Sequence, residues 1–98
     1  MHVLAEIQLI PIGVGPSVRA QVQRAHDIIA ASGMIIEQHG FGTNVEGELD
    51  ELLAVIKSIH ETLHAEGVVR LTSAIKIGSR TDKLPHLADK KLMTRGQG

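Results

Sequence analysis

Apolar and polar residues alternate along residues 3–12, and a period of two is typical of a β-strand. The stretch Gly13-Val14-Gly15-Pro16 ends this pattern. In residues 18–29 the apolar residues then recur at helical spacing. Ser17 is suited to be the N-cap of this helix, and Gly33 is suited to end it. The first third of the chain therefore predicts a strand followed by a helix.

The rest of the chain predicts a strand at residues 35–41 and a short one at 43–47, joined by a tight turn at Gly42. Residues 48–66 place apolar side chains along one helical face, and residues 68–77 alternate again as a last strand. This order predicts a ferredoxin-like βαββαβ sandwich of class α+β. Its four-stranded antiparallel sheet carries both helices on one face.

The other face of the predicted sheet has no helix to cover it. We expect it to carry Leu4, Glu6, Gln8, Ile10, Asn44, Glu46, Arg70, Thr72 and Lys76. Such a mixture of aliphatic and charged groups is either a docking site for a partner or the floor of a ligand pocket. Acidic residues are depleted in strands, so Glu6 and Glu46 on neighbouring strands predict a shared acidic spot. Their carboxylates either contact a ligand or pair with Arg70 and Lys76.

Length and composition narrow the possible functions. A chain of 98 residues fits one domain, which we place at residues 1–83. Residues 84–98 form a polar tail, expected to be part helical around residues 87–93 and to contact another subunit. The net charge of −1 argues against nucleic acid or an anionic membrane as a partner. Phe41 is the only aromatic residue, which argues against base stacking.

Cysteine is absent, which excludes disulfides and thiolate metal sites. The first residues lack a basic leader and no apolar run is long enough to span a membrane, so a cytoplasmic protein is expected. His60-Glu61-Thr62-Leu63-His64 matches the H-E-x-x-H pattern of zinc enzymes. The third ligand position of the longer pattern is Arg70, a cation, so we interpret this segment as an ordinary helix. Neither a metal site nor a cofactor is expected.

The loop before the first helix allows one enzymatic interpretation. A helix N-terminus favours an anion, although a turn followed by the Ser17 N-cap is the simpler interpretation. Together with Arg19 and Asn44, the loop could imitate an acylphosphatase, which shares this topology. The acylphosphatase loop signature is absent. A small hydrolase of this type stays as an alternative.

Three groups of residues carry a resemblance to a known family. They are Ala5-Glu6-Ile7 with Pro11, Gly42-Thr43 with Glu46-Gly47-Glu48, and Ile75-Lys76-Ile77 followed by Arg80 and Asp82. In this order and at these spacings they resemble the YkoF-like thiamine-binding family. The resemblance runs from Val3 to about Lys83.

The resemblance implies a ferredoxin-like fold, dimers that pair through sheet edges, and tetramers that pack face to face. It also implies binding of thiamine or its hydroxymethylpyrimidine moiety without catalysis. By position, the candidate ligand contacts are Glu6, Ser17, Thr43 and Glu46, with Lys76 and Arg80 as weaker ones. Besides the acylphosphatase-like hydrolase, a structural or regulatory assembly without a ligand is the other alternative.

Overall fold

The computed structural model describes residues 1–13 and 19–87. Its elements follow the predicted order: β1 (His2–Ile12), α1 (Arg19–Ala31), β2 (Ile35–His39), β3 (Gly42–Glu48), α2 (Leu49–Ala65) and β4 (Arg70–Gly78). The ferredoxin-like α+β prediction is confirmed. Ser17, predicted to cap the first helix, lies outside the described residues, as does most of the predicted helix at 87–93.

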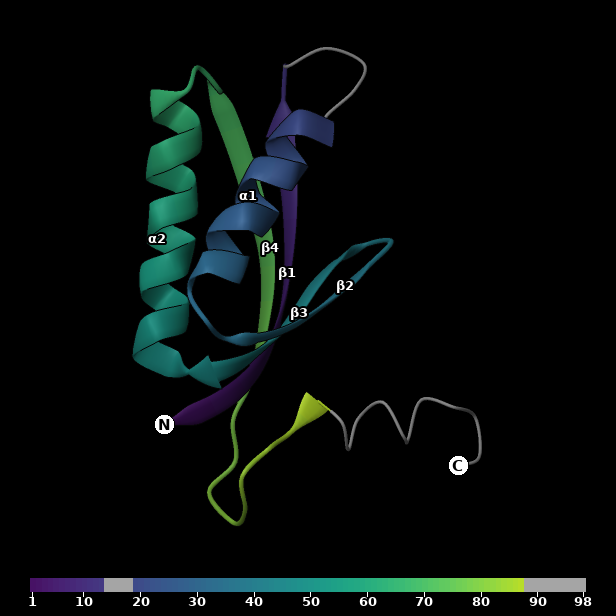
Figure 1. Cartoon of the computed structure of the whole chain (residues 1–98), viewed down its shortest axis with the longest axis vertical. Coiled ribbons are helices and arrows are strands. Elements are labelled where there is room, and N and C mark those ends of the chain that lie inside the picture. The colour runs from purple at the N-terminus through teal and green to yellow at the C-terminus, as the bar shows by residue number, and fades with distance from the viewer. Residues whose placement is uncertain (14–18, 88–98) are drawn as a thin grey trace.

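The four strands form one antiparallel sheet in the order β2-β3-β1-β4. Figure 1 shows α1 and α2 side by side over one face of this sheet, while the β2–β3 hairpin extends away from the helices. The longest strand, β1, is central and pairs with both β3 and β4. Every other element is therefore positioned relative to β1.

The hydrophobic core lies between the helices and the sheet. Its innermost side chains come from four elements, with Val3 and Ile7 on β1, Ile29 on α1, Val45 on β3, and Leu52, Ile59 and Leu63 on α2. Each such side chain contributes roughly 1.5–3 kcal/mol when it leaves water. Because successive strand residues point to opposite faces, the even-numbered residues of β1 lie on the face without helices. The register places Leu4 beside Glu46 and Glu6 beside Asn44 and Lys76, which confirms the predicted face.

The predicted and observed boundaries differ by one or two residues at several ends, and two of these differences follow from a backbone hydrogen bond. The last strand begins at Arg70 rather than Val68, because the backbone N–H of Val68 donates to Leu63 O (3.0 Å) and still belongs to the end of α2. The second strand ends at His39 rather than Phe41, because the backbone N–H of Phe41 bends back to His39 Nδ1 at 3.2 Å. Phe41 lies in the turn between β2 and β3 and is 80% exposed.

No helix among residues 1–13 and 19–87 is both long enough and apolar enough to cross a membrane.

Gly42 lies so close to β1 that no side chain fits there. A Cβ atom at this position would come within 2.5 Å of the carbonyl oxygen of Ile7, a backbone atom that cannot move aside alone. We expect Gly42→Ala to lower the free energy of unfolding by about 2 kcal/mol, measured by urea denaturation. Gly40→Ala in the same turn is the matched control, because a Cβ there meets nothing within 4 Å. Equal stability of the two variants would contradict this account.

Candidate functional site

Two pockets lie on opposite faces of the sheet. The first, which we call the helix-side pocket, has a volume of about 310 Å³ and lies between α1, β1 and the β2–β3 turn. The second, the open-face pocket, has a volume of about 470 Å³ and lies between the sheet and the segment that follows β4. Both volumes are in or near the range of small-molecule sites. The two pockets differ sharply in chemistry.

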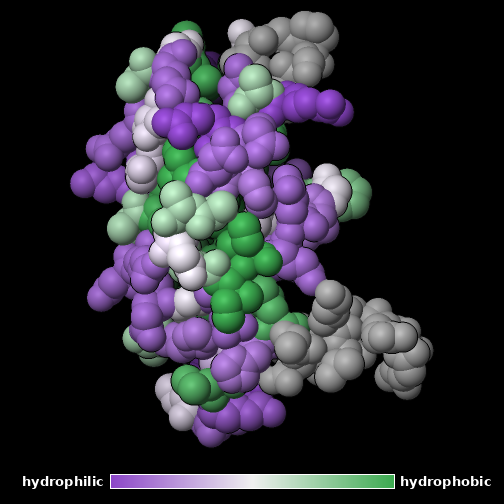
Figure 2. Space-filling model, in the orientation of Figure 1, coloured by the Kyte–Doolittle hydropathy of each residue, from purple (hydrophilic) through white to green (hydrophobic). Residues whose placement is uncertain are grey.

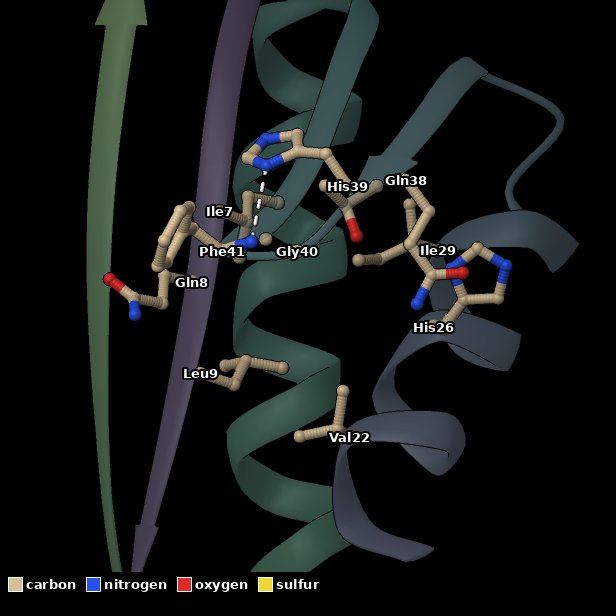
Figure 3. A pocket seen from close by; sticks show the side chains of 12 residues that line it. Ile7, Gln8, Leu9, Val22, His26, Ile29, Gln38, His39, Gly40 and Phe41 are labelled. Atoms are coloured by element: carbon tan, nitrogen blue, oxygen red, sulfur yellow. Dashed lines mark hydrogen bonds between the residues drawn. The ribbon is translucent and has the colours of Figure 1, made fainter. Parts of the chain in front are cut away.

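The helix-side pocket combines aliphatic walls with neutral polar groups. Its residues include Ile7, Leu9, Val22, His26, Ile29, Gln38, Phe41 and Thr43. None of the described residues that line it is Asp, Glu, Lys or Arg. Leu9 and Val22 face each other across it in Figure 3, and His26 lies beside Gln38. This environment suits a flat, uncharged ring that carries hydrogen-bonding groups.

His26 lines this pocket and carries a hydrogen-bonding atom that is not satisfied. Its Nδ1 atom is buried and has no hydrogen-bond partner within the described part of the chain. Thr43, at 6% exposure, supplies a nearby hydroxyl that can both donate and accept. A buried polar atom without a partner costs roughly 1–3 kcal/mol, so a ligand atom that bonds it would recover that energy.

The open-face pocket is built over a polar row that crosses all four strands. The register aligns Glu37 on β2, Asn44 on β3, Glu6 on β1 and Lys76 on β4. Of these, Asn44, Glu6 and Lys76 line the pocket together with Arg80, while Leu4, Pro85 and Leu87 give it apolar walls. Charged groups of both signs therefore face this pocket.

His39 fixes the orientation of this polar row. Its Nδ1 accepts the backbone N–H of Phe41, so Nε2 carries the ring proton. Nε2 donates to Asn44 Oδ1 at 3.1 Å and lies 3.3 Å from Glu6 Oε2. The residue of β4 that pairs with Glu6 is Lys76, as predicted. Arg70 pairs instead with Ile12, at the far end of β1. Arg70 is therefore not positioned to neutralise either carboxylate.

Glu46 forms a separate cluster with residues from both ends of the fold. Its Oε2 atom accepts hydrogen bonds from His2 Nε2 (2.9 Å) and His86 Nδ1 (3.0 Å). Its Oε1 atom accepts the backbone N–H of Leu87 at 2.9 Å. We call His2, Glu46 and His86 the Glu46 cluster. The side chain of Glu46 is only 5% exposed, so it does not share an open acidic spot with Glu6.

The Glu46 carboxylate is ionised despite its burial. Burial by itself raises the pKa, but the hydrogen bonds from His86, the Leu87 backbone and His2 outweigh it and lower the pKa of Glu46 to about 2. Hydrogen bonds to a charged acceptor are the strong kind, roughly twice as strong as neutral ones. The cluster therefore fastens the segment after β4 to the sheet.

The predicted ligand contacts are thus divided among separate places. Glu6, Lys76 and Arg80 line the open-face pocket, Thr43 lines the helix-side pocket, and Glu46 is engaged in its cluster. Ser17 lies outside the described residues. Arg80 also forms an ion pair with Asp82, and this pair lowers the pKa of Asp82 to about 2.

The sequence did not lead us to predict the histidine of the helix-side pocket or the two histidines of the Glu46 cluster. His26 could have been found, because it follows Val22 by four residues and precedes Ile29 by three, on the apolar side of the helix. His2 and His86 gave no such signal. They lie 84 positions apart, and only the folded sheet brings them to Glu46.

The H-E-x-x-H segment on α2 is occupied by structural contacts. His60 Nε2 bonds Ser73 Oγ at 2.8 Å, and His64 Nδ1 donates to the carbonyl oxygen of Val68 at 2.7 Å. The two rings have separate partners, with centroids 6.3 Å apart. These contacts support the interpretation of this segment as an ordinary helix.

Arg19 and Asn44, the residues of the acylphosphatase alternative, are not brought together. Arg19 begins α1 on the helix side of the sheet, whereas Asn44 bonds Glu37 and His39 on the open face. The hydrolase alternative thereby loses its geometric basis.

Comparison with known proteins identifies the family. The profile named Thiamine-binding protein matches residues 5–94. The chain belongs to this family. A UPF0045 protein of Synechocystis is 39% identical over 92 residues, which are 94% of this chain and 75% of that protein. The crystal structure of a hypothetical protein from Methanocaldococcus jannaschii is 35% identical, with a TM-score of 0.85 over 98% of this chain and 97% of that one.

A more distant structure shares the fold alone. It comes from Thermotoga maritima, is provisionally described as a thiamine biosynthesis or salvage protein, and is 21% identical with a TM-score of 0.82. It covers 97% of this chain and 99% of that one. The resemblance inferred from the sequence is confirmed at the level of the family by the matching profile.

Glu46→Gln tests the energetic role of the cluster. We expect it to lower the free energy of unfolding at pH 7 by about 1–2 kcal/mol, because an amide loses the charge-assisted hydrogen bonds. The pKa of Glu46 is depressed from 4.5 to about 2 in the fold, so its contribution is present above pH 4.5 and is lost as the pH falls toward 2. The difference in the free energy of unfolding between wild type and Glu46→Gln should therefore shrink as the pH falls from 4.5 toward 2.

This gap is measured by urea denaturation from pH 7 downward in the presence of EDTA. Glu66→Gln is the control, because Glu66 forms an exposed ion pair with Arg24 and should change stability by less than about 0.5 kcal/mol. A stability difference for Glu46→Gln that does not change with pH would contradict this role of the ionised carboxylate.

Proposed function

We propose that this protein binds thiamine or its hydroxymethylpyrimidine moiety in the helix-side pocket and catalyses no reaction. The observation that carries this proposal is the buried Nδ1 of His26, which has no hydrogen-bond partner among residues 1–13 and 19–87, in a pocket lined by no Asp, Glu, Lys or Arg. Membership of the thiamine-binding family supplies the ligand class.

The chemistry of an aminopyrimidine fits this lining. The ring is flat and neutral, its exocyclic amino group donates hydrogen bonds, and its ring nitrogens accept them. Nδ1 of His26 would accept from the amino group, and the Thr43 hydroxyl or the Gln38 amide would donate to a ring nitrogen. The side chains of Leu9 and Val22 would pack against the two faces of the ring.

Phe41 gives the cationic part of thiamine a place at the rim of this pocket. Its ring is 80% exposed, and an aromatic face attracts a cation by roughly 0.5–1 kcal/mol at an exposed site. The open-face pocket is the other location to consider, since it contains Glu6. There, Lys76 lies beside Glu6 and Arg80 is paired with Asp82, so no carboxylate among the described residues of this pocket is left without a neighbouring cation to attract the thiazolium, and we favour the helix-side pocket.

Calorimetric titration with thiamine and with hydroxymethylpyrimidine tests both ligand and location. Thr43→Val keeps the shape of the side chain and removes the hydroxyl, so we expect affinity to fall about tenfold. Glu6→Gln is the matched control and should bind as wild type does. The proposal would be refuted if neither thiamine nor hydroxymethylpyrimidine gave a heat of binding with the wild-type protein. Loss of binding in Glu6→Gln with retention in Thr43→Val would instead place the ligand in the open-face pocket.

We also propose that the protein is a cytoplasmic homo-oligomer that associates through the open face. This face carries Ile10 and Ile12 at one end of β1, at 40% and 36% exposure. Towards the other end of β1, the register aligns Ile35, at 58% exposure, with Glu46 and the half-buried Leu4. Apolar groups gathered on one face mark association surfaces more often than scattered ones do. The sheet also ends in two strands, β2 and β4, that each lack a neighbour on one side within the described residues.

Ile10→Lys should reduce the molar mass measured by light scattering after size-exclusion chromatography, because a charge would be buried at the subunit contact. Leu53→Lys is the matched control, since Leu53 is 49% exposed on α2, on the other side of the molecule. A monomeric wild type, or an equal effect of both substitutions, would argue against association through this face.

A further inference from the structure

We propose that His2, Glu46 and His86 form a binding site for a divalent transition-metal ion of the Zn²⁺ class. One nitrogen from each imidazole and one carboxylate oxygen lie within 4.8 Å of one another. Three elements contribute these atoms: the start of β1, the middle of β3 and the segment after β4. In the part of the chain that the structure describes, this is the group of His and acidic side chains that converges in this way.

The distances within the cluster are close to those that a metal ion requires. Zn²⁺ holds nitrogen and oxygen ligands at about 2.0–2.2 Å, so neighbouring ligand atoms of a tetrahedral site lie roughly 3.3 Å apart. His2 Nε2 and His86 Nδ1 lie 2.9 and 3.0 Å from Glu46 Oε2. Small side-chain rotations would therefore admit an ion between the three atoms. The proton on each bonding nitrogen would leave for solvent or for the other ring nitrogen.

The surroundings of Glu46 support a metal ligand at this position. The backbone N–H of Leu87 holds Oε1 and leaves Oε2 directed at both imidazoles, which is how outer partners orient metal-binding carboxylates. Glu46 is 5% exposed and fixed on a strand, whereas His86 is 47% exposed. The cluster is therefore rigid at its base and open to solvent at one side, where an ion can enter and water can complete the coordination.

The donor set indicates which ions fit. Two imidazole nitrogens and one carboxylate suit Zn²⁺, Ni²⁺ or Co²⁺, while Mg²⁺ and Ca²⁺ prefer oxygen ligands throughout. A bound ion would join residues 86–87 to β3 more firmly than hydrogen bonds do. Because Leu87 also forms part of the open-face pocket, the ion would fix one wall of that pocket.

Zinc titration of the protein, made without a polyhistidine tag and without any thiamine compound, tests the site. We expect one Zn²⁺ per chain by calorimetry and at least about a tenfold loss of affinity in His2→Asn and in His86→Asn. Both histidines are partly exposed, so these variants should fold. His64→Gln, which alters the H-E-x-x-H segment, is the matched control and should bind zinc as wild type does. Co²⁺ in place of Zn²⁺ should give the absorption bands of a nitrogen- and oxygen-ligated ion.

Two results would overturn the site. One is the absence of zinc binding by wild type at micromolar concentrations. The other is wild-type affinity in His2→Asn and His86→Asn. Thermal unfolding adds an independent measurement, because zinc should raise the melting temperature of wild type and His64→Gln but not of His86→Asn. Neither measurement depends on pyrimidine binding, so this site and the proposed function can fail separately.

Discussion

The pairing of β1 with a strand on each side is the constraint on which the rest of this structure depends. The odd-numbered residues of β1, which include Val3, Ala5 and Ile7, enter the core, and its even-numbered residues lie on the open face. A shift of one residue in register would exchange the two sets. The burial of Val3 and Ile7, at 1% and 2% exposure, therefore also fixes Glu6 against Asn44 and Lys76. The stability of the core and the geometry of the open face are set by the same hydrogen bonds.

The sheet also separates two kinds of chemistry. Neutral groups and aliphatic walls lie on the helix side, where α1 shields them from water. Charged groups lie on the open face, where solvent or another subunit can balance them. A carboxylate on the helix side would have no such partner, and its burial would be costly. This division explains why residues predicted to contact one ligand lie in different pockets.

Periodicity predicted the fold because the longer elements each have a clear repeat of their own. The alternation in residues 3–12 and the helical spacing in 48–66 are long enough to be unambiguous. Errors occurred where backbone hydrogen bonds decide a boundary, as at Val68, whose N–H still closes α2. The face on which Glu46 lies followed from the same alternation. The contacts of His86 and Leu87 with Glu46 on that face could not be predicted in this way, since both residues belong to a polar segment without a repeat.

The Glu46 cluster closes a loop of the chain between residues 2 and 86. Such closure resembles a crosslink in its effect on chain entropy, although hydrogen bonds can open and re-form. Its consequence is cooperativity at the sheet margin, where the beginning of β1 and the segment after β4 share one anchor. If either segment detaches, the other loses a partner and the carboxylate becomes open to water. The two segments would then open together as a single unit. The rate of hydrogen exchange at the backbone N–H of Leu87 would therefore also report how often the beginning of β1, at residue 2, detaches.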